Sequence, residues 1–166
     1  MKIESTSGKG NFQIVKGNFA LTELKFKNWF SKNAATRYKG VNIELKSQNF
    51  WQTQFDILKN GMNCGSMKYH WKGNISIQLT DELGYVEGNY MFRSKGIFKR
   101  QFELSDEYGN LILILKPKFI FRKFSYDYEV ETIKTFDEEE DLVEMLIYCG
   151  YAANLYMKKK ASKSAG

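Results

Sequence analysis

The sequence predicts a mostly β fold, a closed antiparallel barrel of about 12 strands that encloses a hydrophobic C-terminal helix. Three observations predict it. Aromatic residues make up 16% of the 166 residues, and they favour strands because they cover pleated surfaces well. Strand-length runs follow one another with Gly, Asn and Asp between them, and the chain closes with a helical segment that has almost no polar side chain. The length fits one domain, which we place at residues 1–160.

The strand-length runs extend from residue 11 to residue 133. Many of them alternate, as Ile75, Ile77 and Leu79 do with their polar neighbours, and this period is that of a sheet with one buried face. The runs are NFQIVKG, FALTELKFKNWF, ATRYKG, VNIELK, FWQTQFDIL, GSMKYHWKG, NISIQLT, YVEGNYMFR, GIFKRQFELS, NLILILK and FIFRKFSYDYEVE.

An internal repeat indicates how these runs are joined. IQLTDELG (77–84) and FELSDEYG (102–109) share one pattern 25 residues apart, and FDILKNG (55–61) is a weaker third copy. In each, a strand ends at an Asp or Asn that can bond to the turn backbone, and a Gly can take the positive φ that returns the chain. The repeat therefore predicts consecutive hairpins of a meander.

The closing segment predicts a helix over residues 138–158. Five carboxylates at 137–141 and three lysines at 158–160 match the two ends of a helix dipole. Between them, residues 142–157 contain Glu144 and Asn154 as clearly polar side chains, so apolar material must surround the helix. A tail anchor in a bilayer is one alternative, although 16 residues fall short of the ~20 that a crossing needs.

Enclosure by the barrel is the interpretation we favour for this helix. The small residues Gly150, Ala152 and Ala153 would let it fit where the wall comes close. Residues 161–166 are polar, small and basic, and we expect them to form a disordered tail.

The FELSDEYGNLILILK-type hairpins and the terminal helix LVEMLIYCGYAANLYM resemble the tubby C-terminal-like superfamily, which comprises tubby proteins, phospholipid scramblases and LURP-one-related proteins. The resemblance covers about residues 40–160. It implies a closed twelve-stranded barrel threaded by the helix, and an association with membrane phospholipids. It also implies a non-enzymatic protein without a cofactor, because the helix fills the space where a substrate would sit. We recognise no copy of the tubby phosphoinositide-binding motif, so no binding residue is carried over.

The charge distribution favours an anionic partner. The net charge is +6, and residues 1–136 hold 21 Lys/Arg against 13 Asp/Glu. Lipid headgroups, nucleic acid and phosphorylated ligands all fit a basic body, and a basic surface kept for solubility is the plainer alternative.

A basic outer face is the candidate binding site. In KPKFIFRKF (116–124), strand alternation places Lys116, Lys118 and Arg122 on the solvent side and Phe119 and Phe121 on the core side. The hairpin arm before it adds further basic residues. We call the whole set the predicted basic face, and we expect it to hold phosphate groups of lipid headgroups: Lys95, Lys99, Arg100, Lys116, Lys118 and Arg122.

Strand alternation places Arg100 on the same side as its apolar neighbours, so we expect a structural carboxylate beside it or a position at the barrel rim.

Two other functions stay open. The run LILIL (111–115) is apolar on both faces, which suggests a protein partner or a homodimer. The segments KFKNWF (25–30) and MKYHWKG (67–73) could stack bases of single-stranded nucleic acid, although no nucleic-acid-binding signature supports that function.

No catalytic or metal-binding site is expected. His70, Cys64 and Cys149 have neither the spacing of a zinc site nor a third group to orient a thiol–imidazole pair. The Asp81-Glu82 and Asp106-Glu107 pairs fit turns better than calcium loops. Two cysteines, expected as free thiols, and the absence of a secretory signal in MKIESTSGKG predict a cytoplasmic protein, and lipid binding would make it peripheral to the membrane.

Overall fold

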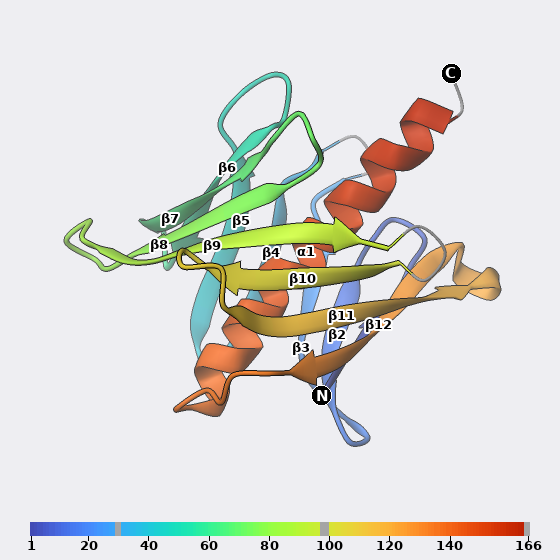
Figure 1. Cartoon of the computed structure of the whole chain (residues 1–166), viewed down its shortest axis with the longest axis horizontal. Coiled ribbons are helices and arrows are strands. Elements are labelled where there is room, and N and C mark those ends of the chain that lie inside the picture. The colour runs from blue at the N-terminus through green and yellow to red at the C-terminus, as the bar shows by residue number, and fades with distance from the viewer. Residues whose placement is uncertain (29–30, 97–99, 165–166) are drawn as a thin grey trace.

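A computed structural model describes residues 1–28, 31–96 and 100–164, with side chains as far as Ser162. Within these residues, twelve antiparallel strands form one closed barrel around a single α-helix (Figure 1). The predicted fold class is therefore confirmed. Each strand pairs with the strands before and after it in the chain, and β1 pairs with β12 to close the wall. The meander predicted from the repeated hairpins is also confirmed.

The elements have the following bounds: β1 Lys2–Ser5, β2 Phe12–Lys16, β3 Phe19–Phe26, β4 Ala34–Tyr38, β5 Val41–Ser47, β6 Gln54–Lys59, β7 Met62–Tyr69, β8 Ile75–Thr80, β9 Val86–Lys95, β10 Gln101–Asp106, β11 Leu111–Ile120, the 3-10 helix η1 Phe121–Lys123, β12 Ser125–Thr132 and α1 Glu139–Ser164.

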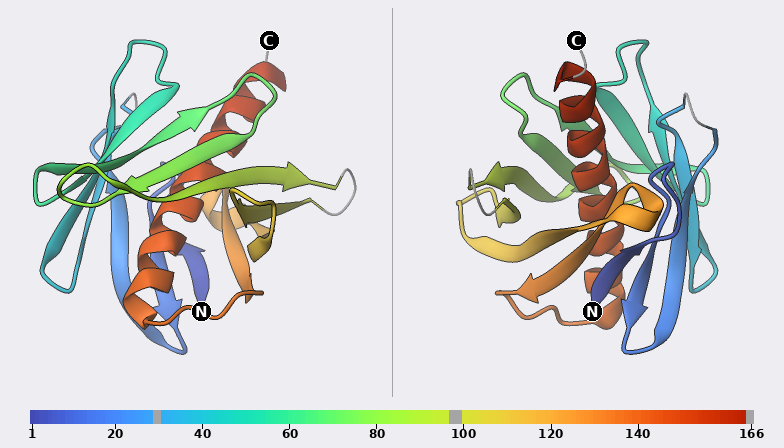
Figure 2. Two further views of the ribbon diagram at one scale, coloured as in Figure 1. Left: turned by 60° about the vertical axis from the view of Figure 1, so that its left-hand side comes forward. Right: turned by 90° about the vertical axis from the view of Figure 1, so that its right-hand side faces the viewer.

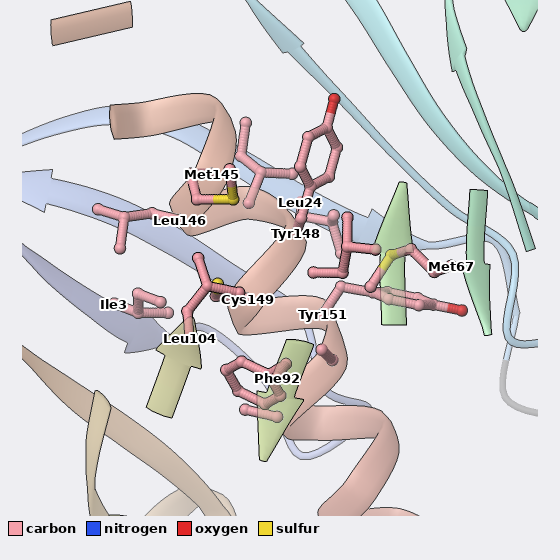
Figure 3. Packing of buried hydrophobic residues seen from close by; sticks show 14 of the residues in the cluster. Ile3, Leu24, Met67, Phe92, Leu104, Met145, Leu146, Tyr148, Cys149 and Tyr151 are labelled. Carbon is pink, nitrogen blue, oxygen red and sulfur yellow. The ribbon is translucent and has the colours of Figure 1, made fainter. Parts of the chain in front are cut away.

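The helix α1 runs through the barrel, and the wall surrounds its middle (Figure 2). The side chains from Met145 to Leu155 are buried, and in Figure 3 those of Met145 and Tyr148 lie among side chains of the wall. Gly150 is needed at the closest approach, because an added Cβ would lie 2.7 Å from the ring of Phe12. The apolar closing segment is thus the core of the barrel, as predicted.

The helix is longer than the sequence predicts. It continues to Ser164, so residues 161–164, expected to belong to a disordered tail, are helical. Three lysines in the last turns suit the negative end of the helix dipole. Within the described residues, no helix combines the length and the apolar character that a bilayer crossing requires.

Three hydrogen bonds from buried side chains fix the position of α1 along the barrel. The Tyr128 hydroxyl donates to Asn154 Oδ1 at 2.9 Å, and Asn154 Nδ2 donates to the carbonyl of Gly10 at 2.9 Å. The Tyr151 hydroxyl donates to the carbonyl of Lys32 at 2.8 Å. Because an unpaired buried polar group is costly, a shift of the helix by one residue would be strongly unfavourable.

The repeated motifs form matching turns. Asp81 Oδ1 accepts the backbone N–H groups of Leu83 and Tyr85 at 2.9 and 2.8 Å. Asp106 Oδ1 accepts those of Tyr108 and Asn110 at 3.0 and 2.8 Å. The acidic residues singled out in the sequence are therefore turn formers.

The apolar run LILIL does not offer an exposed face. Ile112 is 3% exposed and Ile114 is 9% exposed, although alternation points Ile114 away from the helix. A β-bulge between Leu104 and Ser105 shifts the register against β11 at this point. The outer side of this strand therefore needs no second subunit to cover it.

Candidate functional site: the basic end of the barrel

The predicted basic face is divided between the barrel wall and one end of the barrel. Lys116 lies in the wall, where its ammonium group pairs with Glu131 at 2.6 Å. Lys118 is exposed on the same strand and lies opposite Asp127 in the register. Arg122 lies beyond the strand, in η1. A single continuous stripe of cations along β11 is therefore not formed.

The expected alternation of residues 116–124 is wrong in its second half. Phe119 is 39% exposed and Phe121 is 78% exposed, so neither is a core residue. The strand ends at Ile120, η1 follows, and Phe124 takes a left-handed conformation with φ of 47°. Because alternation ends where the strand ends, Arg122 is displayed at a hairpin tip.

Lys95 and Arg100 lie at the tip of the neighbouring β9–β10 hairpin. Lys95 is the last residue of β9 and is exposed. Arg100 is half-buried, and its Nη1 lies 3.6 Å from the sulfur of Met157 near the end of α1. This is a rim position, one of the two surroundings expected for it. Lys99 lies outside the described residues.

Both hairpin tips belong to one end of the barrel, where the C-terminus of α1 leaves it (Figures 1 and 2). We call this the basic end and define it by α1 from Lys158 to Ser162 and by the described residues of six connecting segments: 6–11, 27–28 with 31–33, 48–53, 70–74, 96 with 100, and 121–124. These described residues include ten Lys/Arg and no Asp or Glu.

The opposite end has the opposite charge. Its connecting segments are 17–18, 39–40, 60–61, 81–85, 107–110 and 133–138, and together with residues 139–141 of the first turn of α1 they contain eight Asp/Glu against two Lys. Glu139 and Glu140 of the first turn of α1 pair there with Lys16 and Lys39. The charge of the molecule is thus separated along the barrel axis.

Lys158 and Lys32 are two half-buried cations of the basic end. Lys158 Nζ donates to the carbonyl of Lys9 at 2.6 Å and lies 4.0 Å from the ring centroid of Phe26. Burial lowers the pKa of Lys158. Burial also lowers the pKa of Lys32, and the positive charge of Lys158 lowers it further. No carboxylate in the described part of the chain forms an ion pair with either lysine. An anion between them would relieve this repulsion.

Other cations of this end are held by the loops. Lys159 Nζ lies 4.1 Å from the ring centroid of Tyr69, and Lys123 Nζ donates to the carbonyl of Ser5 at 2.6 Å. Lys27 has a distant carboxylate partner, Glu44, at 3.9 Å. Because these contacts limit the motion of the side chains, the positive charge is concentrated in a defined place.

Exposed aromatic side chains stand among these cations. Phe50 and Trp51 form an edge-to-face pair in the segment 48–53, with ring centroids 5.7 Å apart. Trp71, Phe121 and Phe124 occupy two further segments, and all five side chains are at least 78% exposed. Aromatic rings of this kind favour the interface between water and lipid or the faces of unstacked bases.

The histidine and the cysteines do not form a reactive cluster. His70 Nε2 is hydrogen-bonded to Ser76 Oγ at 2.9 Å. Cys64 and Cys149 are buried free thiols, and burial raises the pKa of Cys149. Among the residues that the structure describes, no group of three or more His, Cys, Asp or Glu is placed to hold a metal ion.

The basic end was not visible in the sequence because its segments are separated by whole strands. The sequence feature that could have identified the basic end is the absence of Asp and Glu from every second connection between strands.

Comparisons of the chain with protein-family models, with curated proteins and with solved structures give no match.

Proposed function

We propose that the protein is a non-enzymatic module of tubby-like architecture that associates with anionic phospholipid headgroups at a membrane surface, using the basic end of the barrel. The observation that carries this proposal is the composition of that end, with ten Lys/Arg and no Asp or Glu among its described residues. Such a module would act as a peripheral protein on the cytoplasmic side of a membrane.

Electrostatics gives the proposed association its strength. Each basic residue near an anionic bilayer contributes about 1 kcal/mol, so even three or four contacts yield useful affinity. The eight carboxylates of the opposite end are repelled by the same surface. Both effects favour one orientation, with the C-terminus of α1 facing the lipid.

The exposed aromatic side chains support a lipid surface as the partner. They stand in three separate connecting segments of one end, and loop tips are the parts that a flat surface meets first. Rings at the headgroup level would add apolar contact to the attraction between charges. A single strand of nucleic acid, the other polymer that suits lysines and aromatic rings, is best bound along a continuous groove.

Liposome co-sedimentation tests this proposal. The wild-type chain should bind vesicles that contain phosphatidylserine, should dissociate as salt is added, and should not bind pure phosphatidylcholine vesicles. The variant Lys72→Glu/Arg122→Glu reverses two exposed charges of the basic end. The loss of two cations costs about 2 kcal/mol, which lowers the partition coefficient by about 30-fold, and the new carboxylates lower it further.

The matched control is Lys116→Glu/Lys134→Glu, which changes the net charge equally in the wall and at the opposite end. It should retain most of the binding. Equal losses in the two variants, or equal binding to neutral and anionic vesicles, would contradict the proposal. Salt-sensitive binding to a single-stranded oligonucleotide without binding to vesicles would assign the basic end to nucleic acid instead.

A further inference from the structure

A cavity lies at the end of the barrel opposite the basic end, in its mouth beside the first turns of α1. It has a volume of about 320 Å³, which is within the range of small-molecule sites. Residues 134–137 of the connection between β12 and α1 form one of its walls. That connection is held in place, because the N–H groups of Ile133 and Lys134 both donate to the carbonyl of Ile112, at 2.8 and 3.1 Å. We call this space the mouth cavity.

The inner part of the mouth cavity is apolar. Ile112 and Met145 are buried and line it together with the ring of Tyr148. The half-buried side chains of Leu79 and Phe136 continue this lining toward solvent. Such a lining suits a short hydrocarbon group.

The outer part of the mouth cavity is anionic. Four carboxylates line it against two lysines. Glu144 is already engaged, because it pairs with Lys59 at 2.6 Å and accepts the Tyr148 hydroxyl at 2.7 Å. Glu87, Asp137 and Asp141 form no ion pair with the described residues. Three carboxylates are therefore available to a cation.

Tyr90 lies where the negative charge of nearby carboxylates acts inside this cavity. Its phenol is part of the lining and is half-buried. Burial raises the pKa of Tyr90, and the carboxylates of Glu87, Asp106 and Asp141 raise it further. Negative charge from three different segments of the chain thus acts on the same interior point, and the aromatic ring can itself attract a cation.

We propose that the mouth cavity binds a small organic ammonium ion, a protonated aliphatic amine. Its hydrocarbon part would lie on Ile112, Met145 and Phe136, and its ammonium group would meet Glu87 and Asp141. A hard metal ion is the less suitable occupant, since it requires six or more oxygen ligands in close array. The described residues hold no group of three or more acidic, Cys or His side chains arranged for a metal.

Nuclear magnetic resonance of the full chain with ¹³C-methyl methionine tests this proposal, because the Met145 methyl group reports on the floor of the cavity. The probes are pentylammonium, pentan-1-ol and pentanoate, which share one hydrocarbon chain and differ in charge. Pentylammonium should shift the Met145 signal and bind at least about tenfold more tightly than the alcohol, since a charge-assisted contact exceeds a neutral one. Pentanoate should bind most weakly.

The variant Glu87→Gln/Asp141→Asn should lose about tenfold in affinity for pentylammonium while its affinity for the alcohol is unchanged. The matched control Glu129→Gln/Glu131→Gln removes the same charge from exposed positions of β12 and should bind pentylammonium like the wild type.

Three results would each overturn the proposal: equal affinity for the amine and the alcohol, a Met145 signal that no probe shifts, or equal losses of affinity in the two variants. The wild-type probe series decides the question even if a variant fails to fold. The cavity lies at the end opposite the proposed lipid-binding site, so the two proposals stand or fall separately.

Discussion

Asn154 is a buried polar side chain in the middle of an apolar helix. Its amide accepts a hydrogen bond from Tyr128 and donates one to the carbonyl of Gly10, so it joins α1 to β12 and to the loop between β1 and β2. In the sequence, Asn154 stood out as one of two polar residues in a run of sixteen. Its partners could not be predicted, because they lie 26 and 144 residues away.

The substitution Asn154→Leu keeps the number and branching of the side-chain heavy atoms and removes both hydrogen bonds. We expect the free energy of unfolding to fall by about 1–3 kcal/mol, because the Tyr128 hydroxyl and the Gly10 carbonyl remain buried without a partner. Urea denaturation measures this loss. Adding Tyr128→Phe in the Asn154→Leu background should recover part of it, since the unpaired hydroxyl is then absent.

A substitution that removes a solvent-exposed hydrogen bond is the control for this prediction. Gln78→Ala removes a 2.9 Å bond to Asn89 on the outer surface and should change the free energy of unfolding by no more than about 0.5 kcal/mol. If Asn154→Leu is equally mild, the buried bonds do not fix the helix, and the account of its position along the barrel is wrong.

At the scale of elements, the hairpin turns show how a short motif sets a strand connection. The Asp106 carboxylate accepts the side chain of Asn110 at 3.0 Å as well as two backbone N–H groups. The hydrogen bond from the Asn110 side chain, together with those backbone bonds, lowers the pKa of Asp106. The ionised carboxylate is thus the form that the folded turn prefers.

Asp106→Ala should therefore lower the stability at neutral pH. A carboxyl group whose pKa is depressed by folding stabilises the protein above its unfolded value, about 4, and this contribution is lost as the pH falls through the folded-state value. The difference between wild type and Asp106→Ala should accordingly shrink below about pH 4. Thermal unfolding from pH 7 to pH 2 checks this prediction, with the exposed neighbour variant Glu107→Ala as the control that should track the wild type. A difference that is constant with pH would rule out the carboxylate as its source.

The sequence predicted most elements because their patterns are local. Alternation identified the strands from β2 to β10, and the charged ends identified α1. β1 was missed because four residues, KIES, are too few to display a period, although this strand closes the barrel through pairs with β2 and β12. The region after Ile120 was misread because alternation says nothing about where a strand stops, and η1 turns Phe121 outward there.

At the scale of the whole molecule, the two ends of the barrel are products of topology. In a closed meander, every second connection returns to the same end, so segments far apart in the sequence form one surface. The separation of charge between the ends follows from this rule and from the composition of each connection. Local sequence patterns could identify single basic segments, such as 116–124, but they could not show that Lys9, Lys32 and Lys158 share an end.

The same topology makes the barrel dependent on its helix. Six large side chains of α1 are at most 5% exposed: Met145, Leu146, Ile147, Tyr148, Tyr151 and Leu155. At about 1.5–3 kcal/mol for each buried side chain, they contribute about as much as the whole net stability of a typical domain, 5–15 kcal/mol. Without them, the inward side chains of Phe12, Phe55 and Phe92 would line a space open to water.

We therefore expect a chain that ends at residue 136 not to fold, even though it retains all twelve strands. It should lack a near-ultraviolet circular dichroism signal and show no cooperative unfolding transition. A chain that ends at Lys160 is the control, because it retains every helical side chain described as buried, and its unfolding midpoint should remain close to that of the full chain. Cooperative unfolding of the shorter chain would mean that the wall is stable alone, and the helix would then be an occupant of the barrel and not its core.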